Sequence, residues 1–436
     1  MRSPGARPAK HAAHVRQTLA VCIGHANARV GTLTYVKQGA RENSAFAYDA
    51  TWLARSDCFA VSPDLALTPD YQFRRAPSRE DSVFHHAIAD TEPDAWGRRV
   101  IARDHAKRRA TEALPALTEL DYLMAVDDFS RLGALRLQDP AVDTPRLADE
   151  GRRTTPPLVD LRNVYEATRA VELSRESAAD LRYLLGKGTS LGGLRPKCTV
   201  LDVDGRLSLG KFPSVDDERD VTRGEILALT LARNAGIDVA TARIEVVEGT
   251  AIGIIARFDR TSDDRRIPYL SAASLLQASR REERAYTEIV DAIRAHGYDP
   301  IADARQLWRR LAFNLLITNV DDHLHNLGFL HVEKGLWRLS PAFDVNPFPD
   351  RDNESKTWLS EEDGPVTSVS TLLARAPYFS LDPQTARSVL GEIVRAVSRW
   401  RSVARSREVG LSNLDLAAFE PAFEHAQMRE ARAHLP

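Results

Sequence analysis

Three oxygen-bearing side chains in the second half of the chain have the types and spacing that phosphoryl transfer requires. Asp321 is followed five residues on by Asn326, and Asp344 comes after a short intervening stretch. Phosphoryl transfer needs a carboxylate that orients the attacking hydroxyl, and amide or carboxylate oxygens that hold Mg²⁺. The spacing D-x-x-x-x-N is that of a kinase catalytic loop, with a further metal-binding aspartate downstream. We therefore interpret Asp321, Asn326 and Asp344 as a candidate catalytic set.

A glycine-rich segment, Gly188-Thr-Ser-Leu-Gly-Gly-Leu-Arg-Pro-Lys197, precedes this set. Gly192 and Gly193 allow the backbone to approach a ligand closely, and Ser190 and Lys197 add a hydroxyl and a charge. The segment is not a Walker A motif, because no G-K-[S/T] ends it. Taken alone, it is more typical of a flexible loop before a strand.

Lys211 follows at the end of a predicted strand, where a lysine can reach nucleotide phosphates. Glu225 stands near the start of the next helix and has two equal readings, as a partner of Lys211 or as part of a capping box with Thr222.

Each of these signals has a simpler alternative. Asp and Asn directly after a helix are often loop or capping residues. His323 and His325 lack a third obvious ligand and make a poor zinc site, and Asp322 is expected only to be solvated. The combined order of glycine loop, strand lysine, D-x-x-x-x-N, hairpin and aspartate is what favours phosphoryl transfer over these alternatives.

The elements that must position these residues change in character along the chain. A small β unit is predicted over 17–48, helical material over 82–110 and 159–185, and a loop or linker over 140–157. Hairpins are predicted over 197–212, 242–258 and 327–339, and the first of them carries Asp204-Gly205, which suits a type I′ turn. Helices are predicted over 222–235, 284–296 and 303–318 and through most of the remainder. This order indicates a bilobal α+β fold with a β-rich N-terminal lobe, a mainly helical C-terminal lobe and a cleft between them.

Composition narrows the function classes only moderately. The chain has 436 residues and a net charge of −2, so neither a nucleic-acid nor a membrane partner is required. The three cysteines are scattered, and no apolar run approaches the ~20 residues of a membrane-spanning helix. We expect a cytoplasmic location, and we expect no direct reading of DNA by this chain.

Several segments together resemble the HipA family of atypical Ser/Thr kinases of toxin–antitoxin pairs. The segments that carry the resemblance are Val30-Gly-Thr-Leu33, Phe46-x-Tyr48, Trp52-Leu53, Pro93-Asp-Ala-Trp-Gly-Arg98, Ser190-Leu-Gly-Gly-Leu-Arg-Pro-Lys197, Lys211, Arg257-Phe-Asp-Arg260, Asp321-x-His323-x-x-Asn326 and Leu339-x-Pro-x-x-Asp344. They extend over nearly the whole chain. The resemblance divides it into a tail (1–16), an N-terminal subdomain (17–150), a nucleotide-binding lobe (151–262) and a helical lobe (263–436).

The resemblance also implies roles and partners. Asp321 would be the catalytic base, Asn326 and Asp344 would hold Mg²⁺, and Lys211 and His323 would contact the phosphates of ATP. Gly192, Gly193 and Lys197 would belong to the phosphate loop, Phe258 would pack on adenine, and Ser190 would be an autophosphorylation site. A helix-turn-helix antitoxin that binds operator DNA and a tRNA synthetase-like substrate would be the partners. A small-molecule kinase and a non-catalytic co-repressor that acts with a DNA-binding partner remain the alternatives.

Overall fold

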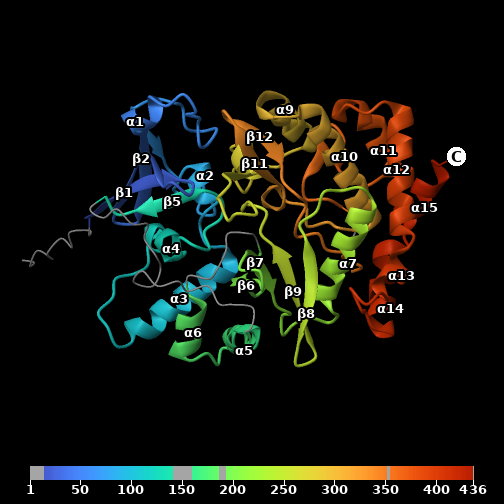
Figure 1. The fold of residues 1–436 in the computed structure, drawn as a ribbon, viewed down its shortest axis with the longest axis horizontal. Coiled ribbons are helices and arrows are strands. Elements are labelled where there is room, and N and C mark those ends of the chain that lie inside the picture. Colours follow the sequence, from blue (N-terminus) through green and yellow to red (C-terminus); the bar gives the residue numbers. More distant parts are fainter. Residues whose placement is uncertain (1–13, 141–159, 186–192, 351–353, 436) are drawn as a thin grey trace, which may run out of the picture.

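The computed structural model describes residues 14–140, 160–185, 193–350 and 354–435. It confirms the expected α+β class, with sheets in the N-terminal half and mostly helices after them (Figure 1). The borders between the predicted domains stay a prediction. Strand β1 begins at His14, inside the segment predicted to be a tail.

The N-terminal part is built on a five-stranded sheet with the order β4-β3-β2-β1-β5, whose neighbouring strands are antiparallel. Its strands are β1 (His14–Ile23), β2 (Ala28–Gln38), β3 (Arg41–Tyr48), β4 (Gln72–Arg74) and β5 (Leu135–Gln138). The helices of this part are α1 (Ala50–Leu53), α2 (His86–Ala89), α3 (Ala95–Arg109) and α4 (Glu119–Ala125). The helix predicted over 82–110 is thus two helices, and Asp94 caps the second by accepting a hydrogen bond from the backbone N–H of Gly97 at 2.8 Å.

A second, four-stranded antiparallel sheet has the order β6-β7-β9-β8. It consists of β6 (Lys197–Leu201), β7 (Leu207–Lys211), β8 (Ala242–Val247) and β9 (Thr250–Ala256). Along β9, Ile252 and Ile254 face the cluster formed with α3, α5 (Leu161–Glu172) and α6 (Ala178–Leu184). Gly253 points the other way, toward Thr222 and Ile226 of α7 (Val221–Asn234). This alternation places helices on both faces of the sheet.

The three predicted hairpins are confirmed, but one turn type and one helix cap are wrong. Glu248 and Gly249 both have positive φ, of 50° and 81°, as a type I′ turn requires. In the first hairpin Gly205 has a positive φ but Asp204 does not, so the predicted type I′ turn is absent there. The N–H of Gly205 donates to the carbonyl of Asp202 at 2.9 Å, and the loop is longer than two residues. The N-cap of α7 is Asp220, not Thr222, and Glu225 is therefore free for another role.

The C-terminal part is mainly helical, as expected. It contains a three-stranded sheet, β10 (Tyr269–Ser271), β11 (Gly328–Glu333) and β12 (Leu336–Leu339), and the short pair β13 (Trp358–Ser360) and β14 (Gly364–Pro365). Its helices are α8 (Ala272–Leu275), α9 (Tyr286–His296), α10 (Pro300–Leu316), η2 (Leu324–Asn326), α11 (Val369–Arg375), η3 (Ala376–Phe379), α12 (Pro383–Val397), α13 (Trp400–Ala404), α14 (Asn413–Phe423) and α15 (Ala426–Ala433).

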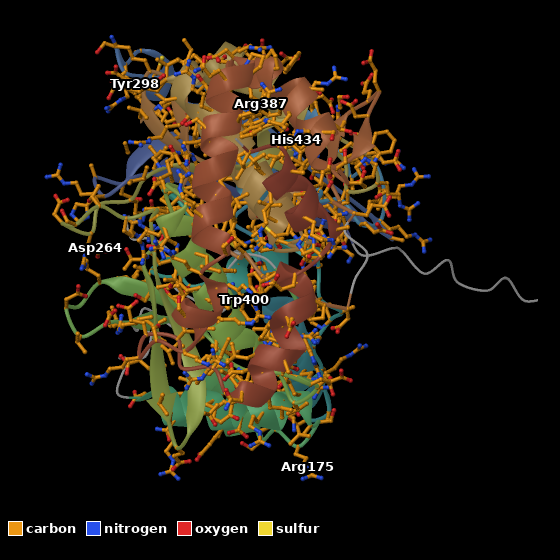
Figure 2. The ribbon with its side chains drawn as sticks, turned by 90° about the vertical axis from the view of Figure 1, so that its right-hand side faces the viewer. Arg175, Asp264, Tyr298, Arg387, Trp400 and His434 are labelled. Carbon is orange, nitrogen blue, oxygen red and sulfur yellow. The ribbon has the colours of Figure 1, made fainter. Side chains whose placement is uncertain are left out.

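Helix α10 forms the centre of this part, with Trp308, Phe313 and Leu316 buried in the same core as the last helices. Figure 2 looks onto those last helices from outside, where Arg387 of α12 lies on the surface. None of the helices in the described ranges combines the length and apolar character needed to cross a membrane.

Candidate active site

The loop after α10 places Asp321. The helix ends at Leu316, and Thr318 takes a left-handed conformation with φ 52°. The chain then turns back toward the helix at Asn319. The backbone N–H of Asn319 donates to the carbonyl of Asn314 at 2.9 Å, and its side-chain amide donates to Oδ1 of Asn314 at 3.1 Å. The chain therefore leaves the helix in one fixed direction, and Asp321 lies two residues further on.

Asn326 closes the same loop. Its Nδ2 donates to the backbone carbonyl of Asp321 at 2.8 Å, which orients its other atom, Oδ1. That oxygen is buried and has no hydrogen-bond partner among the described residues. A buried amide oxygen of this kind is available as a ligand for a cation or a donor.

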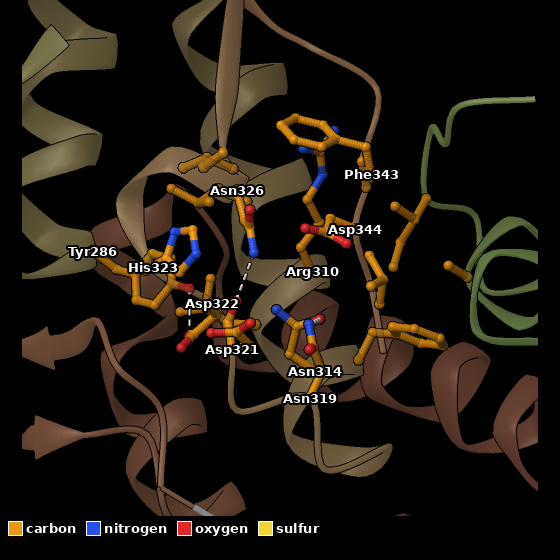
Figure 3. Close-up of a pocket in the computed structure, with 18 residues that line it drawn as sticks. Tyr286, Arg310, Asn314, Asn319, Asp321, Asp322, His323, Asn326, Phe343 and Asp344 are labelled. Carbon is orange, nitrogen blue, oxygen red and sulfur yellow. Dashed lines mark hydrogen bonds between the residues drawn. The ribbon is translucent and has the colours of Figure 1, made fainter. Parts of the chain in front are cut away.

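Asp344 arrives from the hairpin of β11 and β12, which begins two residues after Asn326. Its backbone is left-handed, with φ 54°, an uncommon conformation for a residue other than glycine. Its Oδ1 accepts hydrogen bonds from Nζ of Lys211 at 2.6 Å and from Nδ2 of Asn346 at 3.3 Å. The predicted meeting of the catalytic loop and the downstream aspartate is thus observed (Figure 3).

Lys211, at the end of β7, joins the two halves of the site. Its Nζ lies 2.6 Å from Asp344 and 2.6 Å from Oε1 of Glu225 on α7. Burial alone would lower the pKa of Lys211, but the two carboxylates raise it above its ordinary value. Burial raises the pKa of Glu225, whereas the charge of Lys211 overcomes burial at Asp344 and lowers its pKa. The ammonium group is therefore firmly charged, and Glu225 acts as its partner rather than as a cap.

Two cavities meet at Phe343 and Asp344. The first lies among Asp321, His323, Asn326 and Asp344, as Figure 3 shows. The second is lined by Leu209, Lys211, Ile255, Ala256, Arg257, Phe258, Asp259, Phe343 and Asp344. Five of these nine residues are apolar, and Phe258 packs against Phe343 with ring centroids 5.3 Å apart. A flat apolar group in the second cavity would have Lys211 and Asp344 beside it.

Asp321 itself forms an ion pair with Lys356, a residue from the segment before β13. The neighbouring Asp322 was expected only to be solvated, and this expectation is wrong. Its Oδ2 accepts from the hydroxyl of Tyr286 at 2.6 Å, and its Oδ1 accepts from the backbone N–H of Lys356 at 2.7 Å. Asp322 therefore ties the segment of Lys356 to the catalytic loop, and burial raises its pKa to about 6.

The glycine-rich segment is only partly described. Ser190 and Gly192 lie outside the described residues, and Gly193 has φ 93°. Lys197 lies opposite Lys211 in the pairing of β6 with β7, and its charge helps to lower the pKa of Asp344. Its ion-pair partner is Asp94, whose Oδ2 lies 3.1 Å from its Nζ, and both side chains are only 3% exposed. The glycine of the loop is nevertheless near, because a Cβ on Gly193 would lie 3.2 Å from Nζ of Lys197.

The residues present fit a magnesium ion. The carboxylate of Asp344 and the unpartnered Oδ1 of Asn326 are hard oxygen ligands, the type that Mg²⁺ prefers. Within the described ranges, no group of three or more His, Cys, Asp and Glu side chains is arranged to hold a metal ion. An ion at this place would take its other ligands from phosphate oxygens and water, as is usual for Mg²⁺.

The fold and the arrangement of Lys211, Asp321, Asn326 and Asp344 define a kinase-like bilobal α+β protein. The HipA N-terminal domain matches residues 20–126, and the HipA-like C-terminal domain matches residues 189–400. The chain belongs to the HipA family.

Two known proteins illustrate this membership. The HipA protein of Shewanella oneidensis, solved in a complex with HipB and its operator DNA, superposes with a TM-score of 0.65 at 16% identity, over 95% of this chain and 96% of that one. A Haemophilus influenzae protein described as "Putative kinase" is 23% identical over 221 residues, which are 44% of this chain. This match spans 64% of that relative's length.

Sequence reasoning missed three residues at the site, Asp94, Tyr286 and Lys356. Asp94 lies in the segment Pro93-Asp-Ala-Trp-Gly-Arg98, which resembles the HipA family, but nothing in that segment indicates an ion pair with Lys197. Tyr286 and Lys356 contact the catalytic loop from segments 36 and 35 residues away from their partners. Only eight of the 59 basic residues are lysine, and this scarcity is the one signal in the sequence that could have pointed to Lys356.

Proposed function

We propose that this protein is an ATP- and Mg²⁺-dependent kinase that transfers the γ-phosphoryl group to a serine or threonine hydroxyl of a protein. The observation that carries the proposal is the contact of Lys211 with both Glu225 and Asp344, beside a cavity that Asp321 and Asn326 also line. This set combines a fixed cation, oxygen ligands for a metal and a separate carboxylate for the acceptor.

Each residue has a defined task in this proposal. The adenine ring occupies the apolar cavity beside Phe258, and its phosphates extend toward Lys211. Asn326 and Asp344 hold the magnesium ion, which neutralises charge on the phosphates when bound. Asp321 orients the acceptor hydroxyl and takes its proton as the oxygen attacks the γ-phosphorus and the bond to the β-phosphate oxygen breaks. His323 lines the first cavity together with Asp321, Asn326 and Asp344, and it contacts the phosphates.

Asp321 is suited to this task because it is less enclosed than the carboxylates around Lys211. Its side chain is 33% exposed, against 7% for Glu225 and 19% for Asp344. An entering hydroxyl can therefore reach it. Catalysis here rests on positioning and charge neutralisation, since phosphoryl transfer demands little covalent chemistry of the protein.

The test is transfer of labelled phosphate from ATP with Mg²⁺, to the protein itself and to proteins of a lysate. We expect wild type to transfer phosphate and Asp321→Ala to lose at least about 100-fold in rate, the usual scale for a general base. Asp57→Ala, which removes an exposed aspartate elsewhere, is the matched control and should keep full activity. ATP binding without transfer to any acceptor would contradict the proposal.

We further propose Ser190 as a self-phosphorylation site that turns the enzyme off. A phosphoryl group in the glycine-rich segment adds about −1.5 to −2 charges where ATP phosphates bind, which repels ATP. Ser190→Ala should lose most of the self-labelling but keep transfer to other proteins. If Ser190→Glu binds ATP as tightly as wild type, the off-switch is wrong.

The partners proposed are a helix-turn-helix antitoxin and, as substrate, a translation component such as a tRNA synthetase. The likeness to a HipA protein crystallised with HipB and operator DNA favours the first. The same likeness supports a second candidate function, a co-repressor that needs no catalysis. Operator binding by the complex that is unchanged in Asp321→Ala, together with a wild type that transfers no phosphate, would favour that function.

A further inference from the structure

Two lysines face each other where the sheet of β6 to β9 meets the site. Lys197, the first residue of β6, is the register partner of Lys211, the last residue of β7. Residues directly opposite each other in an antiparallel pair lie on the same face of the sheet, with Cβ atoms about 4.5–5.5 Å apart. Like charges in this arrangement repel each other. The pairing of these two lysines therefore requires anions close by.

Each lysine has its own carboxylate partners. Nζ of Lys211 lies 2.6 Å from Glu225 and 2.6 Å from Asp344. Nζ of Lys197 lies 3.1 Å from Oδ2 of Asp94, and Lys197 forms no other ion pair within the described ranges. Both side chains of this second pair are only 3% exposed, so water compensates neither charge. The buried ammonium group of Lys197 therefore depends on Asp94 as its counter-ion.

Asp94 is itself held by a helix and not by the sheet that carries Lys197. It is the N-cap of α3, a helix of 15 residues, and its Oδ1 accepts from the backbone N–H of Gly97 at 2.8 Å. The positive end of the helix dipole favours a carboxylate at this place. Trp96 and Val100 anchor the helix in the apolar cluster beneath the sheet. The carboxylate is therefore a fixed point to which the flexible lysine side chain is tied.

Asp344 is the carboxylate that Lys197 could otherwise contact. Nζ of Lys211 already touches Asp344, and the side chain of Lys197 starts from the opposite position of the register, within reach of the same group. The charges of Lys211 and, next, of Lys197 overcome burial and lower the pKa of Asp344. Lys197 is thus an electrostatic neighbour of Asp344 even while it is paired with Asp94. A second ammonium group on Asp344 would occupy oxygens that a magnesium ion needs.

We propose that Asp94 is a positioning residue that holds the ammonium group of Lys197 away from Asp344 and so keeps that carboxylate available to the metal ion. The proposal rests on the proposed kinase function, because it takes Asp344 as a metal ligand. Asp94 acts only through Lys197. In the simpler alternative, Asp94 caps α3 and neutralises a buried lysine, and its charge has no influence on the metal.

The test is the affinity for a non-hydrolysable ATP analogue, measured by calorimetry with excess Mg²⁺ and again with EDTA. The ratio of the two Kd values reports how well the protein holds the metal. Asp94→Asn keeps a good N-cap residue but removes the charge. We expect this variant to reduce the ratio about tenfold, a usual size for coupling between two sites. The Kd without metal should not rise, because Lys197 keeps its positive charge near the phosphates.

The double variant Asp94→Asn/Lys197→Met tests the cause. It has no ammonium group that could move to Asp344, and it leaves no buried charge without a partner, so it should fold even where the single variant does not. We expect the wild-type ratio of the two Kd values in the double variant. A ratio reduced as far as in Asp94→Asn would overturn the proposal, because the loss would then not come from Lys197.

Asp49→Asn is the matched control, because Asp49 also caps a helix, α1, and also pairs with a cation, Arg29, at 2.8 Å. It should behave as wild type. An unchanged ratio in Asp94→Asn, an equal loss in Asp49→Asn, or a wild type whose binding of the analogue does not depend on Mg²⁺ would overturn the proposal. Failure of the kinase function is a separate result: wild type would transfer phosphate from ATP to no acceptor, whereas the ratio of the two Kd values is measured without transfer.

Discussion

Two contacts between lysine and carboxylate flank the reaction centre, and they differ in almost every physical respect. Lys211 lies between Glu225 and Asp344 and is 12% exposed, so that one ammonium and two carboxyl groups share one enclosed place. The ammonium group of Lys356 forms one ion pair within the described ranges, with Asp321, and its side chain is 50% exposed. The first contact joins the sheet of β6 to β9, α7 and the downstream aspartate, whereas the second joins two loops of the C-terminal part.

This difference separates a buried, strongly held ion pair from an exposed, weakly held one. Ions out of water interact strongly, and removing one of them leaves its partner buried and uncompensated. An exposed ion pair is screened by water and contributes about 0–1 kcal/mol. In the proposed function, the buried contact is therefore suited to fixing the geometry of the phosphates, and the exposed contact to orienting Asp321 where an acceptor can reach it.

The largest expected effect comes from breaking the buried contact. Lys211→Met leaves the carboxylates of Glu225 and Asp344 close together without their cation, and we expect a loss of about 3–5 kcal/mol in the free energy of unfolding, together with loss of phosphate transfer. Denaturant unfolding and the transfer assay measure the two losses separately.

The double variant Lys211→Met/Glu225→Gln tests whether charge is the cause. It removes one of the two uncompensated carboxylates and should regain part of the lost stability, but no activity. Equal stability of the single and double variants would show that the cost lies in packing and not in the unpaired charges.

A smaller effect is expected at the exposed contact. Lys356→Met should change the free energy of unfolding by less than about 1 kcal/mol, because the pair is open to water. We expect it to lower kcat about tenfold to 100-fold, since Asp321 loses the cation that orients it, with little change in the KM for ATP. Lys356→Arg should keep part of the rate.

Lys334→Met is the matched control, because Lys334 is an exposed lysine at the tip of the hairpin of β11 and β12. A faster Lys356→Met enzyme would mean that Lys356 blocks Asp321 rather than assisting it. A loss of stability as large as that of Lys211→Met would remove the distinction between the two contacts.

The same two contacts show how far the sequence could predict this molecule. The buried contact was largely predictable, because Lys211 ends a strand marked by a hairpin turn and Asp344 follows a hairpin whose turn contains Lys334 and Gly335. Local patterns of this kind fix which elements form and where their ends lie. The choice of Glu225 between two roles was not local, since it depended on Asp220 capping α7 and on the sheet packing against that helix.

The exposed contact was not predictable for a related reason. Lys356 is brought to Asp321 by hydrogen bonds of Asp322 with Tyr286 and with the backbone of Lys356, three segments that no periodicity connects. Asp94 and Lys197, likewise, are far apart in the chain and meet only because α3 packs beside β6. Pairings between distant loops follow from the tertiary structure, and a single sequence carries little record of them.

Asp322 offers the smallest and most specific test of how the exposed contact is held. Burial raises the pKa of its carboxyl from an ordinary 3.8 to about 6, so the folded protein favours the protonated form. The stability that this preference contributes is fully present below about pH 4 and is lost as the pH rises through 6.

Asp322→Asn keeps the size and one acceptor for the backbone N–H of Lys356 but does not titrate. The free energy of unfolding of wild type relative to Asp322→Asn should therefore fall by about 1–2 kcal/mol between pH 5 and pH 7.5, as measured by urea unfolding at both values. All other titrating groups are common to the two proteins and cancel. A difference that stays constant with pH would mean that Asp322 is ionised throughout, held by Tyr286 and the backbone as a fixed anion, and that the exposed contact is anchored by charge rather than by a neutral hydrogen-bonded carboxyl.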